Sequence, residues 1–218
     1  MPTDLTPWDL YWEVRLSALE DLGKREAILE ASRLIRTLAE TPGGSVRILE
    51  LGCGEGQIIG ALLEAHAQVP GLQASVGVDY RRMTIETSRR LYPGMRFIEG
   101  DFTDPVLLAG LGQFELVLLV NALHEVFSAT YSAELGEVDV PAAKARVLQA
   151  LEGASGCLAD GGWMVLFDGL EPPGDGGQMV TIRFQSRQAR RRFETFAREF
   201  KPFRIQYQEG AEPGCVEL

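Results

Sequence analysis

The stretch VRILELGCGEGQIIGAL, from Val46 to Leu62, decides the fold of this 218-residue chain. It predicts a buried strand over Val46–Leu51, a turn with glycines at positions 52, 54 and 56, and a helix over about Gln57–Ala67. A parallel strand that feeds such a helix leaves backbone N–H groups at the carboxyl edge of the sheet. Glycine has no Cβ and accepts positive φ, so a ligand can approach the main chain there. The pattern predicts a small-molecule site, and a tight turn that binds nothing is the alternative.

Composition and charge narrow the class of protein. A hydrophobic content of 45% and a charged content of 24% are those of an ordinary globular protein. No apolar run reaches the roughly 18 residues that span a membrane, and the N-terminus lacks the basic and then apolar order of a signal peptide. We therefore expect a cytoplasmic protein that binds no membrane. The net charge of −10 argues against a nucleic-acid partner.

The chain length fits one α/β domain with a short N-terminal addition. We predict an N-terminal helical cap over residues 1–44 and the main domain over residues 45–218. Trp8, Tyr11 and Trp12 in the cap either pack against the domain or form a lid over its ligand. Three cysteines that are far apart in the chain argue against a disulfide framework and a structural zinc site.

Strands and helices alternate along the rest of the chain, which predicts a doubly wound, mostly parallel sheet. The strands after the first are predicted at Ala74–Val78, Met95–Glu99, Phe114–Val120 and Trp163–Phe167. A helix is predicted over 141–158, an irregular interval over 127–140, and a tight turn at Asp160–Gly162.

Acidic residues follow two of these strands. Asp79 stands where doubly wound nucleotide sites place an acid on a ribose, and the alternative is a helix cap. Asp101 either contacts the ligand or caps a short turn. Phe102, beside it, can offer a ring face to a planar base.

The fourth strand ends in the segment Asn121-Ala122-Leu123-His124-Glu125. Polar groups just past a central strand lie where a reacting substrate would bind. His124 either contacts the substrate and moves a proton, or is a polar residue held by its neighbours. His66 is expected on the exterior of a helix. A single His–Glu pair does not predict a metal site.

The C-terminal part is expected to hold a helix over about Ser186–Phe200, a strand near Phe203–Tyr207 and a last strand from Cys215. Its arginines are predicted to form a solvated helix face, and an anionic-substrate or partner patch is the alternative. They are Arg183, Arg187, Arg190, Arg191, Arg192 and Arg198. The chain stops soon after Cys215, and we expect either that it is one domain of a longer protein or that a partner chain closes its edge. A homodimer is therefore left open.

The glycine spacing bears on the ligand. A dinucleotide site of the GxGxxG type would have its third glycine where Gln57 stands. Glu50, before the turn, would repel a pyrophosphate but could pair with an ammonium group. The pattern suits a ligand with ribose, adenine and a cationic end but no phosphate.

At this point the chain resembles the class I S-adenosylmethionine-dependent methyltransferases over nearly its whole length. Five motifs carry the resemblance in the family's order: ELGCGEG (Glu50–Gly56), VGVD (Val76–Asp79), EGDF (Glu99–Phe102), FELVLLVNALHEV (Phe114–Val126) and LADGGWMVLFD (Leu158–Asp168). The resemblance implies S-adenosylmethionine as the cofactor, residues 45–218 as its binding domain, and an antiparallel last strand of the sheet that Cys215–Leu218 would begin.

The resemblance also implies roles for single residues. Glycines 52, 54 and 56 would approach the methionine part of the cofactor, with Glu50 nearby. Asp79 would hold the ribose, with Tyr80 beside it, and Asp101 would accept from the adenine amino group, with Phe102 against the ring. Asn121 would lie near the sulfonium, and His124 is the candidate general base.

The expected reaction is methyl transfer to a small or medium-sized acceptor through an O, N, C or S nucleophile. The fourth strand ends in Asn-Ala-Leu-His, which differs from the Asn-Pro-Pro-Tyr type used on amino groups of bases or glutamine. A non-catalytic S-adenosylmethionine-binding module of a longer protein is the alternative. A nicotinamide-dependent oxidoreductase is disfavoured by the glycine spacing.

Overall fold

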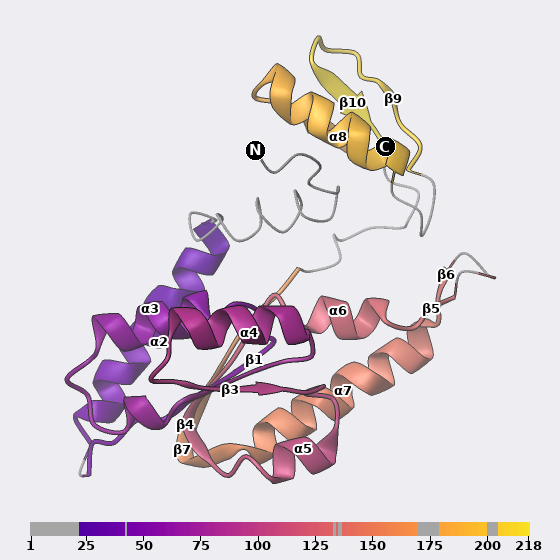
Figure 1. Ribbon diagram of the computed structural model, residues 1–218. Helices are drawn as coiled ribbons and strands as arrows, with labels where there is room; N and C mark the ends of the chain where they lie inside the picture. Colours follow the sequence, from indigo (N-terminus) through magenta and orange to yellow (C-terminus); the bar gives the residue numbers. More distant parts are fainter. Residues whose placement is uncertain (1–21, 42, 133, 135–136, 170–178, 200–204) are drawn as a thin grey trace. The chain divides into compact units, whose positions relative to one another are not determined.

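The computed structural model describes residues 22–41, 43–132, 134, 137–169, 179–199 and 205–218. They fall into two compact units (Figure 1). The sheet unit lies within Leu19–Tyr131 and Val138–Gly169. The C-terminal unit holds the described residues 179–199 and 205–218, and residues 132, 134 and 137 are grouped with it. Trp8, Tyr11 and Trp12, for which packing against the domain and a lid are the predicted alternatives, lie outside the described residues.

The sheet unit is built on five strands in the order β3-β2-β1-β4-β7. Neighbouring strands all pair in parallel, so all five end at one carboxyl edge. The predicted doubly wound parallel sheet is confirmed. The strands are β1 (Ile48–Leu51), β2 (Val76–Asp79), β3 (Arg96–Glu99), β4 (Phe114–Val120) and β7 (Leu158–Phe167).

Helices cover both faces of this sheet (Figure 1). Successive side chains of a strand point to opposite faces, which explains the uninterrupted apolar run of β4. Leu116 and Leu118 join one core cluster with α2, α3 and α4, whereas Val117 and Leu119 join another with α5, α6 and α7. The helices are α2 (Leu22–Ala39), α3 (Gln57–Ala65), α4 (Arg82–Leu91), α5 (Pro105–Ala109), α6 (Leu123–Ser128) and α7 (Val140–Gly156).

The prediction for His66 is wrong. The residue follows the last turn of α3 but is buried, and its Nε2 lies 2.6 Å from Ser32 Oγ on α2. The pKa of His66 is lowered by this burial and by the charge of Arg36. The residue is part of the contact between α2 and α3. The predicted domain boundary at residue 44 stays a prediction, although α2 shares its core with the sheet.

The predicted turn at Asp160–Gly162 is also wrong, because β7 runs through it. Phe114 pairs with Leu158, and Leu116 pairs with Trp163. An advance of two residues along β4 thus corresponds to an advance of five residues along β7. The extra residues form a bulge in which Gly161 has a φ of 74°. After the bulge the register is regular up to the pair Val120–Phe167.

The interval over 127–140 is less irregular than expected. It contains the end of α6 and a short two-stranded ribbon, β5 (Tyr131–Ser132) with β6 (Glu137–Val138). Asp139 caps the next helix, because its side chain accepts a bond from Ala142 N at 3.1 Å.

The C-terminal unit contains α8 (Arg187–Glu199) and a three-stranded antiparallel sheet of order β8-β10-β9. Its strands are β8 (Thr181–Arg183), β9 (Gln208–Glu209) and β10 (Cys215–Glu217). The predicted strand from Cys215 is confirmed, but it pairs within this separate sheet. Of the strand predicted near Phe203–Tyr207, residues 205–207 are described and are not in a strand, and the others lie outside the described residues. Arg183, which the prediction groups with the arginines of a helix face, lies on a strand instead.

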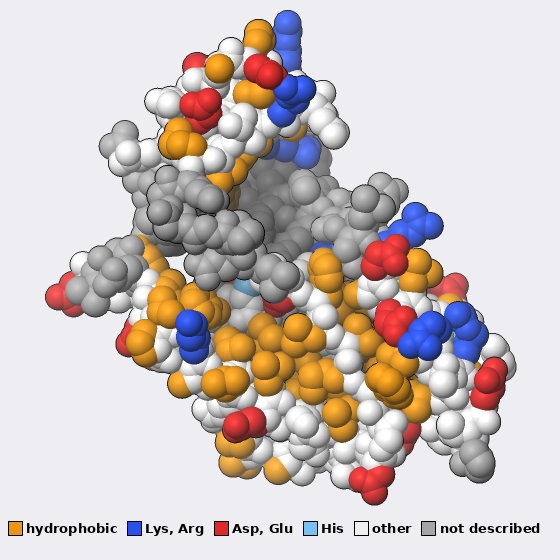
Figure 2. Space-filling model, turned by 180° about the vertical axis from the view of Figure 1, so that it is seen from behind, with side chains coloured by type: hydrophobic (Ala, Val, Ile, Leu, Met, Phe, Trp, Pro, Cys, Tyr) orange, Lys and Arg blue, Asp and Glu red, His pale blue; other side chains and the backbone are white. Residues whose placement is uncertain are grey.

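The arginines of this unit are exposed or half-buried, and several are paired. Arg190 binds Glu194 at 2.8 Å and also Glu209, and Arg183 binds Glu212. These pairs favour the solvated-face interpretation over an anion-binding patch. In the part of the chain that the structure describes, no helix is long and apolar enough to cross a bilayer. The molecular surface carries a broad hydrophobic area on the face shown in Figure 2.

Candidate functional site at the carboxyl edge of the sheet

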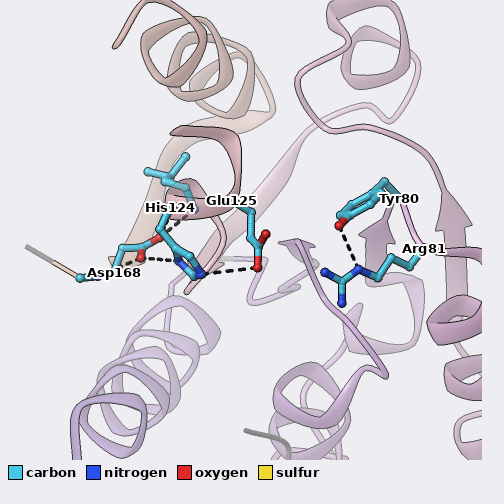
Figure 3. Close-up of polar contacts among 7 residues, drawn as sticks. Tyr80, Arg81, His124, Glu125 and Asp168 are labelled. Carbon is cyan, nitrogen blue, oxygen red and sulfur yellow. Dashed lines mark hydrogen bonds and ion pairs between the residues drawn. The ribbon is translucent and has the colours of Figure 1, made fainter. Parts of the chain in front are cut away.

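The candidate site lies at the carboxyl edge of the sheet. Asp79 is the last residue of β2, and Asn121 and Asp168 directly follow β4 and β7. Figure 3 shows His124, Glu125 and Asp168 on one side of this edge, and Tyr80 with Arg81 on the other. Residues from sequence positions 50 to 168 are thus gathered by the parallel arrangement of the strands.

The three glycines of the turn after β1 have different surroundings. A Cβ on Gly52 would lie 2.8 Å from Ala122 Cβ, and one on Gly56 would lie 2.7 Å from the Phe97 ring. These two glycines therefore permit close packing. Gly54 has a φ of 52°, and nothing lies within 4 Å of its Cβ position. The backbone at Gly54 is the part of the turn that a ligand can approach.

Glu50 is a buried acid beneath this turn. Its side chain is 2% exposed, and Oε2 accepts a hydrogen bond from Ile59 N in α3 at 3.1 Å. The pKa of Glu50 is raised to about 8, mainly because the side chain is buried. The hydrogen bond from Ile59 lowers the pKa, and the negative charge of Asp79 raises it further. A cation bound nearby would offset this burial and favour the ionised form.

Asp79 ties the glycine turn to the end of β2. Its Oδ2 accepts from Gly54 N at 2.9 Å, and its Oδ1 accepts from Arg81 N at 2.8 Å and from Thr84 Oγ1 at 3.1 Å. The residue is buried. Asp79 therefore joins the glycine turn to the segment that leads into α4, and its contact with a ligand stays a prediction.

Tyr80 and Arg81 form the neighbouring part of the edge. Tyr80 is 56% exposed, and its hydroxyl accepts a bond from Arg81 Nε at 2.9 Å. The Arg81 guanidinium lies 5.2 Å from the centre of the Tyr80 ring, in cation–π geometry. An exposed aromatic ring at this position can stack against a ligand.

Asp101 and Phe102 are neighbours in sequence, but Asp101 is exposed and Phe102 is buried. Asp101 is exposed and closes a turn, because Oδ1 accepts from both the backbone N and the Oγ1 of Thr103 at 2.8 Å. Its Oδ2 lies 4.0 Å from Arg146 of α7. Phe102 is 7% exposed and packs in the core cluster of β1 and α6, so little of its ring is left for a planar base.

Asn121 has an unusual backbone. With a φ of 53°, it is the only described residue other than glycine in the left-handed region, and its N–H donates to Phe167 O at 2.7 Å. Such strain is found at functional sites, and asparagine tolerates it better than most residues.

Asn121→Gly is expected to leave the free energy of unfolding within about 0.5 kcal/mol, whereas Asn121→Ala should lower it by about 1 kcal/mol. The reason is that only the alanine Cβ opposes a positive φ. Urea unfolding of the two variants checks this, and equal stabilities would show that the strain is not carried by this residue.

His124 lies in the first turn of α6 and is bonded to Asp168. Its Nδ1 is 2.7 Å from Asp168 Oδ1, and its Nε2 is 3.6 Å from Glu125 Oε1 (Figure 3). The pKa of Asp168 is lowered: burial raises it, but the bonds from His124 and Gly169 outweigh burial. The sequence places Asp168 at the end of a predicted strand, yet no role was predicted for it. A carboxylate directly after a predicted strand was the available signal.

Among the residues that the structure describes, no group of three or more His, Cys, Asp or Glu side chains is placed to hold a metal ion. All three cysteines are buried and free.

Comparison with known proteins shows which domain the central part of the chain is similar to. A family model described as "Methyltransferase domain" matches residues 48–139, which run from β1 to the end of the β5–β6 ribbon and include most of the edge. Residues 48–139 are therefore similar to a methyltransferase domain, and the fold of the sheet unit is the Rossmann-like fold of the class I S-adenosylmethionine-dependent methyltransferases.

Two solved structures share this fold. One is the sugar N-methyltransferase KedS8 from a Streptoalloteichus species, with 17% identity, a TM-score of 0.51 and coverage of 85% of this chain and 64% of that chain. The other is CalS10, an amino pentose methyltransferase from Micromonospora echinaspora, with 19% identity, a TM-score of 0.50 and coverage of 84% and 64%. At these identities the likeness concerns the fold alone.

A curated relative covers a shorter stretch. This chain is 35% identical over 95 residues to a protein from Streptomyces coelicolor that is named uroporphyrinogen decarboxylase. The match covers 44% of this chain and 24% of that protein. The chain thus spans about a quarter of that relative and just under two thirds of each structural neighbour.

Proposed function

We propose that this protein transfers the methyl group of S-adenosylmethionine to a small-molecule acceptor. The observation that carries the proposal is the arrangement at the carboxyl edge: an open glycine turn lies over the buried acid Glu50 and beside the strand-end acid Asp79. The match of residues 48–139 to the methyltransferase domain supports it.

The residues present fit this cofactor. The open backbone at Gly54 leaves room for its methionine part, and Glu50 offers a negative charge for its cationic end. A carboxylate has about four acceptor positions. Gly54, Arg81 and Thr84 use three of those on Asp79, which leaves capacity for a ribose hydroxyl.

The adenine end is assigned to Tyr80 and Asp101. The exposed ring of Tyr80 suits a planar base better than the buried ring of Phe102. Asp101 keeps Oδ2 directed toward Arg146 at 4.0 Å, a distance that leaves this oxygen able to accept from an amino group. Phe102 then supports the site from beneath by packing against Gly52.

When bound, S-adenosylmethionine supplies a methyl group activated by the sulfonium. The chain has to align the incoming nucleophile and, for a protonated one, accept its proton. His124 is the proton acceptor in this proposal, and Asn121 positions groups at the end of β4. Both structural neighbours named above act on sugars, so amino sugars and other small amines are the first acceptors to try.

Calorimetry with S-adenosylmethionine and its demethylated product tests binding, and formation of the demethylated product with a panel of small amines, phenols and thiols tests transfer. His124→Ala is expected to reduce turnover about 100-fold with a protonated acceptor and to change the cofactor Kd less than twofold. Equal turnover in the variant and the unaltered protein would end this role of His124. Failure to bind the cofactor would end the proposed function.

A further inference from the structure

The strongest unassigned feature of the sheet unit is the side chain of Asp168. It is 11% exposed and makes four hydrogen bonds (Figure 3). Oδ2 accepts from the backbone N–H groups of Leu123 and His124 at 2.7 and 3.1 Å. Oδ1 accepts from Gly169 N at 2.8 Å and lies 2.7 Å from His124 Nδ1.

The two oxygens thus serve two purposes. Oδ2 caps the start of α6, whose own cap residue, Ala122, has no side chain able to accept a bond. Oδ1 faces the imidazole ring. An ionised carboxylate can only accept hydrogen bonds, so the ring nitrogen that faces it must carry the proton.

We propose that Asp168 is a positioning residue that holds neutral His124 as the Nδ1–H tautomer and leaves Nε2 as the proton acceptor for the methyl-accepting nucleophile. This inference rests on the proposed function. The bond between the nucleophile and its proton would break, and the proton would pass to Nε2. The electron pair left on the nucleophile would form the new bond to the methyl carbon as the bond from that carbon to the cofactor sulfur breaks, and the electron pair of the broken bond would return to sulfur.

The geometry around the ring agrees with this role. Asp168, which directly follows β7 and is itself held by the backbone N–H groups of Leu123 and His124, fixes the ring on the Nδ1 side. Glu125 Oε1 lies 3.6 Å from Nε2, where it can stabilise the imidazolium that forms.

The chain has two histidines, so the tautomer can be measured directly. We expect ¹⁵N-histidine NMR of the unaltered protein at pH 8 to show the Nδ1–H tautomer for one residue, assigned to His124 by its loss in His124→Gln. The Nε2–H tautomer at this residue would overturn the inference without any need for an Asp168 variant.

Asp168→Asn gives the second test. The asparagine oxygen can keep the cap on α6, and its NH₂ group then faces Nδ1, so the ring must carry its proton on Nε2. We expect the tautomer to switch, turnover to fall roughly 100-fold, and the cofactor Kd to stay within about threefold. Asp139→Asn, which alters a comparable cap on α7, is the matched control and should change none of the three.

The outcomes separate the inference from the proposed function. An unchanged tautomer with full turnover in Asp168→Asn would overturn the inference and leave methyl transfer standing. No cofactor binding by the unaltered protein would overturn the proposed function, and the tautomer of His124 would still show whether Asp168 orients the ring.

Discussion

Glu50→Gln is expected to remove a decrease in the free energy of unfolding that the unaltered protein undergoes as the pH rises. The pKa of Glu50 is raised from 4.5 to about 8 in the folded state, mainly by burial. Between these values the folded state holds a proton that the unfolded state has released. Stability therefore falls as the pH rises through this window, and the full penalty is present above pH 8.

The magnitude follows from the size of the shift. At 1.36 kcal/mol per pH unit, the unaltered protein should lose about 2–3 kcal/mol of unfolding free energy between pH 6 and pH 9 through this residue. The glutamine of the variant keeps an oxygen for Ile59 N and has no proton to lose. Urea unfolding at four pH values compares the two proteins, and Glu64→Gln on the exposed side of α3 is the matched control. Parallel curves for the protein and its Glu50 variant would contradict the prediction.

The same substitution should weaken cofactor binding. A bound ammonium or sulfonium group favours ionised Glu50, so the affinity of the unaltered protein should rise between pH 6.5 and pH 8.5. Glu50→Gln should bind S-adenosylmethionine about 10–100-fold more weakly at pH 8.5 and with little dependence on pH. If Glu50→Gln made the folded protein more stable but did not weaken the binding of S-adenosylmethionine, Glu50 would not interact with the cofactor.

Asp79→Ala is expected to lower the affinity for S-adenosylmethionine at least 100-fold. The substitution removes the charged acceptor proposed for the ribose and also the anchor of the Gly54 N–H. Hydrogen bonds to charged groups are worth about 1.5–3 kcal/mol each, so the loss of two corresponds to this change or more. Stability should fall by about 2–3 kcal/mol because Gly54, Arg81 and Thr84 lose their common acceptor.

Two controls separate these effects. Thr84→Ala removes one donor to Asp79 and keeps the carboxylate, so it should change the affinity less than threefold. Asp104→Ala removes the cap of α5, where Asp104 accepts from Val106 N at 2.9 Å, and should cost about 1 kcal/mol without a change in affinity. Calorimetry at a temperature where all variants are folded is the measurement, and an unchanged Kd for Asp79→Ala would contradict the ribose assignment.

The sheet was predictable because its signals are local. The apolar runs that became β1, β2 and β4 are each followed by glycine or a polar residue, and their alternation with helices admits few topologies. The same pattern placed Asp79, Asn121 and His124 at one edge. The turn at Asp160–Gly162 was a misleading local signal, because a bulge and a turn use the same residues.

Contacts between distant segments were not predictable in the same way. The bond between His124 and Asp168 joins residues 44 positions apart and depends on β7 lying beside β4. The burial of Phe102 depends on Ala122 and α6, and that of His66 depends on α2. The short strands of the C-terminal unit carry few apolar residues, so their pairing left little trace in the sequence.

The bulge in β7 has a consequence at the opposite end of the strand. Side chains alternate between the two faces of a sheet, so one residue more or fewer at Asp160–Gly162 would displace every later residue of β7 by one position relative to β4. Phe167 would no longer face Val120, and the carboxylate after it would turn away from α6. The number of residues in the bulge thus determines whether Asp168, after the far end of the strand, faces His124. We therefore expect homologues to vary the residue types in the bulge more freely than its length.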